Sequence, residues 1–356
     1  MGVTYLRSAW FTTAMAISTP QPVAGLSAEA QPGTPAKDDR PAYRPFGATV
    51  RSVQQLSPHF TRITLTGPQL QFFGTDGDDQ RIKVLFPNPA GHLNDVGADD
   101  QDAIRRGTWY EDWRALPEEE RSPMRTYTVR AVRPTLAEVD VDMVAHGDTG
   151  PASRWVQRAT VNDELVVVGP DARSIHSAGG RDWAPGRAEE MLLAGDETAA
   201  PAICAILENL EPGRRAHAFI EVPSAADFLD VHLPEGADIT WLAREQHPHG
   251  HALVPAVRKW ASRHLASISP AKAVVPQNLE DIDVDSQLLW DSPVLQVQPT
   301  DACGRGERCG GEFYAWFAGE AGVIKTLRRF LVAEVGVCRR RVAFMGYWRQ
   351  GRAEGQ

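Results

Sequence analysis

The chain has 356 residues, a formal net charge of −9 at pH 7 and a hydrophobic content of 42%. This length is enough for two domains, and the hydrophobic content is that of a globular protein. The acidic balance excludes nucleic acid and anionic membranes as main partners, because both require clustered Lys and Arg. Basic residues near the C-terminus still allow one locally positive site.

Residues 1–42 are rich in Ala, Pro, Ser, Thr and Gln. Within them, Trp10–Ile17 follows Arg7 as the apolar part of a secretory signal would, but it is short, contains Thr and lacks a small-x-small cleavage site. We therefore expect residues 1–42 to be a disordered or weakly ordered extension. No other segment approaches the roughly 18 apolar residues of a membrane helix. We expect a soluble, cytoplasmic, monomeric protein without membrane insertion.

From Tyr43 to Pro170 the sequence consists of short alternating runs rich in Val, Thr and Ile, separated by Gly, Pro, Asn or Asp. This pattern predicts an antiparallel β-barrel domain over residues 43–187. The polar stretch Asn88–Arg121 interrupts it and is expected to be a long loop with a little helix. The predicted strands are Gly47–Val53, Phe60–Thr66, Ile82–Phe86, Thr126–Val132, Glu138–Met143 and Glu164–Gly169.

From about residue 188 strands and helices alternate, which predicts an α/β domain with a parallel sheet over residues 188–352. Residues 266–312 form an irregular insertion within it. The predicted strands are Met191–Gly195, His217–Val222, Ile239–Leu242, Phe313–Ala318 and Arg341–Trp348, and the predicted helices are Ala199–Leu210, Leu253–His264 and Glu320–Glu334. Such a two-domain plan suits electron transfer between two ligands.

The four cysteines, Cys204, Cys303, Cys309 and Cys338, are too few and too scattered for a disulfide framework. The segment from Cys303 to Cys309 contains Gly and charged residues like a metal loop, but no second Cys/His pair with ligand spacing follows it. We expect no metal site. Reduced thiols are expected, and a labile disulfide between Cys303 and Cys309 stays open.

The most informative stretch is Arg125-Thr126-Tyr127-Thr128-Val129-Arg130. On a strand, Arg125, Tyr127 and Val129 face one way and Thr126, Thr128 and Arg130 face the other. A cation, an aromatic ring and hydroxyls on adjacent positions suit a flavin nucleotide, which offers a phosphate, a planar ring and ring-edge nitrogens. A barrel surface with Tyr127 packed into the core explains the pattern equally well.

About twenty residues later comes His146-Gly147-Asp148-Thr149-Gly150-Pro151-Ala152-Ser153. Gly147 and Gly150 let the backbone approach a ligand closely, and Pro151 suits the first position of a short helix over residues 152–159. A helix start offers free N–H groups and a positive dipole end for a pyrophosphate. An ordinary loop-to-helix turn is the alternative. Together the two stretches fit one dinucleotide laid across the barrel.

Two further stretches end strands of the α/β domain. Gly195-Asp196-Glu197-Thr198-Ala199 lies at the carboxyl end of a predicted parallel strand, where such sheets bind ligands. Asp196 and Glu197 suit an adenine amine or ribose hydroxyls, although capping by Asp196 and Thr198 also explains them. Gly346-Tyr347-Trp348-Arg349-Gln350-Gly351-Arg352 could cover a flavin face and attract an anionic substrate, or its aromatic residues could simply pack.

These four motifs occur in the order found in siderophore-interacting proteins, which are FAD-containing ferric-siderophore reductases of the ferredoxin-reductase-like superfamily. The chain resembles this family from about Tyr43 to Arg352, and Ala-Gly-Glu-Ala-Gly at residues 318–322 also matches. Residues 1–42 have no counterpart in the family that can be placed, and the Cys303–Cys309 loop lies in a variable insertion.

The resemblance implies that Arg125 holds an FAD phosphate, Tyr127 stacks on the isoalloxazine ring and Thr128 reaches its edge. It also implies that Gly150, Ala152 and Ser153 hold the pyrophosphate, and that Asp196 and Thr198 lie near the adenosine or the nicotinamide nucleotide. The full set of predicted cofactor contacts is Arg125, Thr126, Tyr127, Thr128, His146, Gly147, Gly150, Pro151, Ala152, Ser153, Asp196, Glu197, Thr198, Ala199, Tyr347 and Trp348.

The implied activity is reduction of a ferric siderophore by NADH or NADPH through FAD, with release of ferrous iron inside the cell. No catalytic acid or base is expected, since the flavin performs the chemistry. Lys83, Lys325, Arg349 and Arg352 are the predicted contacts for the anionic ferric chelate. A general flavin or ferric reductase on the same fold and a non-catalytic flavin- or siderophore-binding module stay open. The 2′-phosphate of NADPH needs a cation, for which Arg214, Arg215 and Arg244 are candidates.

Overall fold

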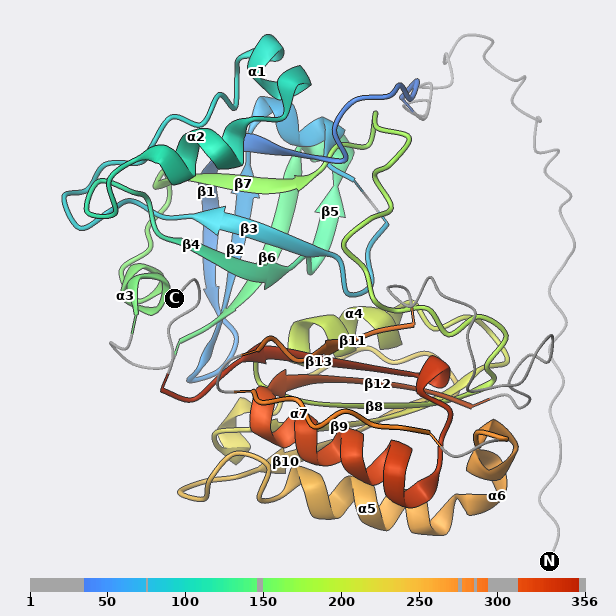
Figure 1. The fold of residues 1–356 in the computed structure, drawn as a ribbon. Coiled ribbons are helices and arrows are strands. Elements are labelled where there is room, and N and C mark those ends of the chain that lie inside the picture. The colour runs from blue at the N-terminus through green and yellow to red at the C-terminus, as the bar shows by residue number, and fades with distance from the viewer. Residues whose placement is uncertain are drawn as a thin grey trace, which may run out of the picture. The chain divides into compact units, whose positions relative to one another are not determined.

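The computed structural model describes residues 35–74, 76–145, 150–274, 277–284, 287–293 and 313–351. Figure 1 shows a curled β-sheet formed by the first half of the chain and a second sheet with helices on both faces formed by the second half. None of the helices among the described residues is both long and apolar enough to cross a membrane.

The first domain is a curled antiparallel sheet with the strand order β4-β3-β7-β1-β2-β6-β5. Its inner face buries Phe46, Ala48 and Val50, which stand at alternating positions of one strand as its pleat requires. The predicted antiparallel barrel is thus confirmed. Its strands are β1 (Tyr43–Gln55), β2 (Phe60–Thr66), β3 (Arg81–Leu85), β4 (Met124–Thr128), β5 (Ala131–Arg133), β6 (Glu138–Val144) and β7 (Glu164–Pro170).

The predicted strand Thr126–Val132 is divided in two. β4 ends at Thr128 because the chain leaves β3 there and crosses to β6 on the opposite edge of the sheet. Val129 still donates its N–H to Gln80 beside β3 (2.9 Å), whereas Arg130 donates its N–H to Asp140 of β6 (2.9 Å). The central hexapeptide therefore brings the two edges of the curled sheet together.

Three short helices accompany this sheet: α1 (Gln101–Arg106), α2 (Trp109–Ala115) and α3 (Pro151–Val156). The first two lie in the polar stretch where a little helix is expected, and Asp100 caps α1 through the N–H groups of Asp102 and Ala103 (2.8 and 3.1 Å). Trp109 and Trp113 pack on the outer face of β3 and β7.

The second domain has a six-stranded sheet in the order β10-β9-β8-β12-β13-β11. The first five strands are parallel, as predicted, but β11 pairs antiparallel with β13. The sheet is therefore mixed, and part of the expected irregular insertion forms its edge. The strands are β8 (Glu190–Asp196), β9 (Arg215–Val222), β10 (Ala237–Ala243), β11 (Trp290–Asp291), β12 (Phe313–Glu320) and β13 (Val342–Trp348).

Helices cover both faces of this sheet (Figure 1). On one face, α4 (Ala200–Glu208) packs with Leu193 and Trp316, and Phe60 of the first domain joins the same cluster. On the other face, Leu192 and Phe317 pack against the remaining helices. These are α5 (Leu253–Arg263), α6 (Leu265–Ile268) and α7 (Ala321–Arg328), and the last continues as a π-helix over Arg329–Val335 where one regular helix is predicted.

Polar contacts join the two domains. Arg130 forms a bidentate ion pair with Glu208 of α4, with both distances 2.6 Å. Trp316 of β12 donates its indole N–H to Asp79 of the first domain (3.0 Å). Asp227, in the loop after β9, accepts from the Ser57 hydroxyl (2.8 Å) in the loop before β2.

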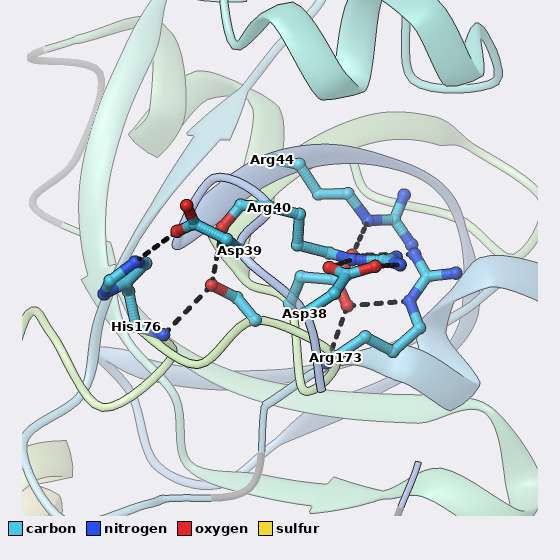
Figure 2. A network of polar contacts seen from close by, with 8 residues as sticks. Asp38, Asp39, Arg40, Arg44, Arg173 and His176 are labelled. Carbon is cyan, nitrogen blue, oxygen red and sulfur yellow. Dashed lines mark hydrogen bonds and ion pairs between the residues drawn. The ribbon is translucent and has the colours of Figure 1, made fainter. Parts of the chain in front are cut away.

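The segment before β1 belongs to the first domain (Figure 2). Asp171 is fully buried and accepts from the guanidinium groups of Arg44 (2.8 Å) and Arg173 (2.9 and 2.7 Å). Asp38 donates its N–H to the Arg173 carbonyl oxygen (2.8 Å). Arg40 also pairs with Asp171 (3.8 Å), so this segment is tied to the strand end at β7 by an ion pair and a backbone hydrogen bond. Residues 1–34 lie outside the described residues.

Candidate functional site

β4 forms one edge of the curled sheet and presents the first three residues of the hexapeptide to the surface. Arg125, Thr126 and Tyr127 are each partly exposed, and Thr128 is buried. Thr126 stands opposite Lys83 of β3, whose ammonium group donates to the Thr126 hydroxyl. Lys83 and Thr126 therefore lie on one face of this edge, and Arg125 and Tyr127 lie on the other.

The start of α3 lies beside this strand. Phe86 contacts Tyr127 of β4 (ring centroids 6.2 Å apart) and Trp155 of α3 (5.3 Å). Gly150 precedes the helix in an extended conformation, and a side chain built on it would meet no protein atom within 4 Å. Open space therefore adjoins the helix start, and Pro151 occupies the first turn as predicted. His146 and Gly147 lie outside the described residues.

These residues fit a flavin dinucleotide in chemical character. The partly exposed Tyr127 ring suits the isoalloxazine face, and the Arg125 guanidinium suits a phosphate. The backbone at Gly150, Ala152 and Ser153 suits a pyrophosphate, since no Cβ blocks the approach at Gly150. The individual contacts stay predictions, but the structure brings the two motifs together.

Asp196, at the carboxyl end of β8, is a buried hub of hydrogen bonds. It accepts from the Thr198 N–H (2.9 Å) and hydroxyl (2.5 Å), from the Glu320 N–H (2.7 Å) and from the Trp348 indole N–H (2.8 Å). Burial, together with the charge of Glu197, raises the pKa of Asp196. Its oxygens therefore serve to join the ends of β8, β12 and β13, and its predicted contact with a nucleotide stays a prediction.

The next residues are also enclosed. Glu197 is fully buried and forms a bidentate pair with Arg244, at the end of β10, with both distances 2.6 Å. Ala199 is fully buried as well. The motif Gly195–Ala199 thus forms a tightly packed strand-to-helix turn.

The C-terminal aromatic residues point to different neighbours. Tyr347 stacks on Trp290 (5.8 Å, 16°) and meets Trp316 edge-on (6.2 Å), in the cluster that also contains residues of the first domain. Burial raises the pKa of Tyr347 well above its ordinary value. Trp348 instead contacts Asp196 and the His249 ring (4.8 Å). Tyr347 is therefore the one placed toward the barrel-facing side of the sheet.

The predicted substrate cations do not gather at one place. Lys83 lies beside Thr126 on the β3–β4 edge, and Arg349 follows β13. Lys325 lies on α7, which covers the sheet face opposite α4, and pairs with Asp281 (2.7 Å). Its place on the far face gives no support to a role beside the flavin strand. Arg352 lies outside the described residues.

The structure adds residues that the sequence motifs do not indicate. Asp79 is buried and accepts from the N–H groups of Asp182 and Trp183 (both 2.9 Å) as well as from Trp316. Its pKa is raised to about 6, chiefly by burial. No local pattern distinguishes it from a turn residue, because its partners lie far along the chain. Glu221 and Glu320, which end β9 and β12, are recognisable only as acids at strand ends.

Known family models match both domains. Residues 49–174 match the siderophore-interacting FAD-binding domain, and residues 188–351 match the siderophore-interacting protein model. The chain is 28% identical to ferric vibriobactin reductase ViuB of Vibrio cholerae over 84% of this chain and 87% of that one. It is 31% identical to the NADPH-dependent ferric-chelate reductase of Escherichia coli over 56% of this chain and 71% of that one.

A solved structure agrees with these matches. The fold is similar to that of the siderophore-interacting protein SipS from Aeromonas hydrophila, with a TM-score of 0.58 and 28% identity. The similarity covers 88% of this chain and 95% of that one, and so extends over both domains.

Proposed function

Because the chain belongs to the siderophore-interacting protein family, we propose that it is an FAD-dependent reductase of ferric siderophores that takes its electrons from NADH or NADPH. Family models cover both of its domains, and the FAD-binding model spans β4 and α3. One structural observation carries the proposal. The partly exposed Arg125–Tyr127 edge and α3, whose start at Gly150 adjoins open space, lie side by side around Phe86.

Bound FAD would supply the redox chemistry, as an acceptor of hydride from the nicotinamide and a donor of single electrons to ferric iron. The side chains of this protein would bind and orient rather than transfer protons. Arg125 and the backbone at Gly150 would hold the phosphates, Tyr127 would cover the ring, and Tyr347 would approach from the second domain. Lys83, on the other face of the same strand pair, would add a positive charge that attracts an anionic chelate. Ferrous iron binds oxygen-rich chelators far more weakly than ferric iron, so reduction releases the metal.

Polar contacts hold the two domains together. The Arg130–Glu208 ion pair and the Asp79–Trp316 hydrogen bond both cross between the domains. The protein is proposed to act as a cytoplasmic monomer, with the siderophore complex arriving as its substrate. Sedimentation or size-exclusion analysis with light scattering tests the oligomeric state.

The experiment uses the purified full-length protein, whose visible spectrum is recorded before and after NADH or NADPH is added without oxygen. Bound flavin is expected to bleach, and a ferric siderophore is then expected to restore its colour while a ferrous chelator traps the iron. A colourless protein that takes up no FAD would contradict the proposal. Bleaching without reoxidation by any ferric chelate, but with fast turnover of free flavin, would favour a general flavin reductase.

A matched pair of variants links the activity to the proposed site. Arg125→Ala is expected to lower FAD retention at least tenfold, because it removes a phosphate contact. Arg114→Ala removes an equally charged but exposed residue of α2 and is expected to leave FAD content unchanged. Equal FAD content in both variants would exclude Arg125 from the site.

A further inference from the structure

The α/β domain has one place where an electron-donating nucleotide is expected. Ligands of such sheets bind outside the carboxyl ends of the strands, where the strand order reverses. Here the reversal lies between β8 and β12, and a narrow, tightly packed hollow lies at the ends of these strands. Asp196, Glu221, Glu320 and His249 supply its charged and titratable lining, and none of the described residues that line it is Lys or Arg.

The acids of this hollow occupy the helix starts that would otherwise attract phosphate. Glu221 is fully buried and accepts from the N–H groups of Gly250 (2.7 Å), Ala252 (2.9 Å) and Leu253 (3.0 Å), at the start of α5. Glu320 caps α7 by accepting from the Val323 N–H (2.9 Å). A carboxylate at a helix start uses the N–H groups and the dipole that favour an incoming anion.

The candidate cations for a 2′-phosphate are not available at this edge. Arg214 and Arg215 lie at the start of β9, at the opposite edge of the sheet. The loops after β8, β9 and β10 span residues 197–199, 223–236 and 244–252, all of them described, and Arg244 is their only Lys or Arg. Arg244 is buried and bound through both terminal nitrogens to Glu197.

Arg349 is the other described cation that directly follows a strand at the carboxyl edge, and it is distant from the expected ribose. In this class of fold, the adenosine ribose lies near the end of the second strand of the domain, which is β9 here. Arg349 follows β13, three strand positions from β9 in the sheet order. At the usual spacing of neighbouring strands this separation is roughly 14 Å.

On the premise of the proposed function, we infer that the electron donor is NADH and that the carboxyl edge of this sheet rejects the 2′-phosphate of NADPH. A phosphate dianion at this edge would meet the negative charge of Glu221, and the described loops after β8, β9 and β10 offer it no cation other than Arg244, which is paired with Glu197. The inference sets this protein apart from its NADPH-dependent relative. The loop after β9, which contains Ser224 and Ala225, is the part of the chain to which we assign the selectivity.

The first test compares kcat/KM for flavin reduction by NADH and by NADPH in the FAD-loaded protein. NADH is expected to be favoured at least tenfold. Calorimetric titration with ADP and with 2′,5′-ADP gives a second readout independent of activity, and ADP is expected to bind at least tenfold more tightly. NADPH equal to or better than NADH would overturn the inference alone. If neither nucleotide reduced a flavin that dithionite reduces, the proposed function itself would fail.

The second test adds the missing cation. Ala225 is exposed, so Ala225→Arg is expected to fold normally and to raise kcat/KM for NADPH at least tenfold while leaving that for NADH within threefold. Ala225→Gln, which lengthens the side chain without a charge, is expected to change neither. No gain with Ala225→Arg, or an equal gain with Ala225→Gln, would overturn the assignment of selectivity to this loop.

Discussion

Trp348 donates its indole N–H to Oδ2 of Asp196 over 2.8 Å and thereby ties the end of β13 to the end of β8. β12 lies between these strands, and the Glu320 N–H at its end donates to the same oxygen (2.7 Å). One buried carboxylate thus fixes three strand ends at the edge where a nucleotide is expected. It also sets the orientation of the C-terminal aromatic side chain.

Trp348→Phe is expected to lower the free energy of unfolding by about 1–2 kcal/mol, because it removes one hydrogen bond to a buried carboxylate. Urea denaturation measures the change. Trp241→Phe, at a partly exposed position on β10, is the control and is expected to cost less than about 1 kcal/mol. An equal loss in both variants would show that the hydrogen bond to Asp196 contributes nothing beyond ring packing.

Asp79 lies at the contact between the two domains and makes the free energy of unfolding depend on pH. Burial raises its pKa from 3.8 to about 6, so the folded state holds the proton more tightly than the unfolded state. The resulting stabilisation is complete below about pH 4 and is lost as the pH rises through about 6. Between pH 5 and pH 8 this loss amounts to about 1–2 kcal/mol.

Asp79→Asn keeps an acceptor for the three N–H donors but removes the titration. Its free energy of unfolding is therefore expected to fall less than that of the wild type between pH 5 and pH 8, as measured by denaturation at each pH. Asp76→Asn, at an exposed neighbouring position, is expected to behave like the wild type. A wild-type pH dependence retained in Asp79→Asn would contradict the role given to this carboxyl group.

The ion pair between Arg130 and Glu208 is expected to contribute to the joining of the domains. Glu208→Gln is expected to lower the free energy of unfolding by about 1–2 kcal/mol, since the pair is bidentate and partly buried. Arg258 and Glu334 form a similar but more exposed pair, with 42% and 45% of their side-chain surfaces accessible. Glu334→Gln is therefore expected to cost less than about 1 kcal/mol. Equal losses in the two variants would show that the ion pair between the domains contributes no more to stability than the exposed pair does.

Substitution of Gly150 is expected to affect flavin binding without affecting protein stability. A Cβ at Gly150 meets no protein atom within 4 Å, and the same is true of Gly47 on β1. Both Gly150→Ala and Gly47→Ala are expected to leave the melting temperature of the FAD-free protein unchanged. Only Gly150→Ala is expected to weaken FAD binding, by about tenfold in a fluorescence titration, because its methyl group occupies the space beside the helix start. Unchanged FAD affinity in Gly150→Ala would remove this residue from the pyrophosphate site.

Local patterns in the sequence are sufficient to predict most elements of this fold. Alternation of β-branched residues locates strands such as Phe60–Thr66, and the run Met191–Gly195 followed by Pro201 locates the first strand and helix of the α/β domain. The break at Thr128 and the antiparallel strand Trp290–Asp291 depend on partners far along the chain. No periodicity within either segment reveals those partners.

The same distinction applies to the site. The hexapeptide and the Gly150–Pro151 helix start are local signals, and the fold places them together around Phe86. The sequence locates the acids near strand ends, but it does not show which groups they bind. Glu221 caps α5, some thirty residues later in the chain, and Asp196 joins β12 and β13. Lys325 is basic and near the C-terminus, but it lies on α7, which packs on the sheet face opposite α4.

The most direct test of the central claim is rapid mixing, without oxygen, of the NADH-reduced protein with a ferric siderophore. The account predicts that the flavin absorbance returns as the ferrous chelator complex appears, with two ferrous ions formed for each NADH consumed. Reduced flavin that persists in the presence of excess ferric siderophore, with no ferrous iron trapped, would contradict it.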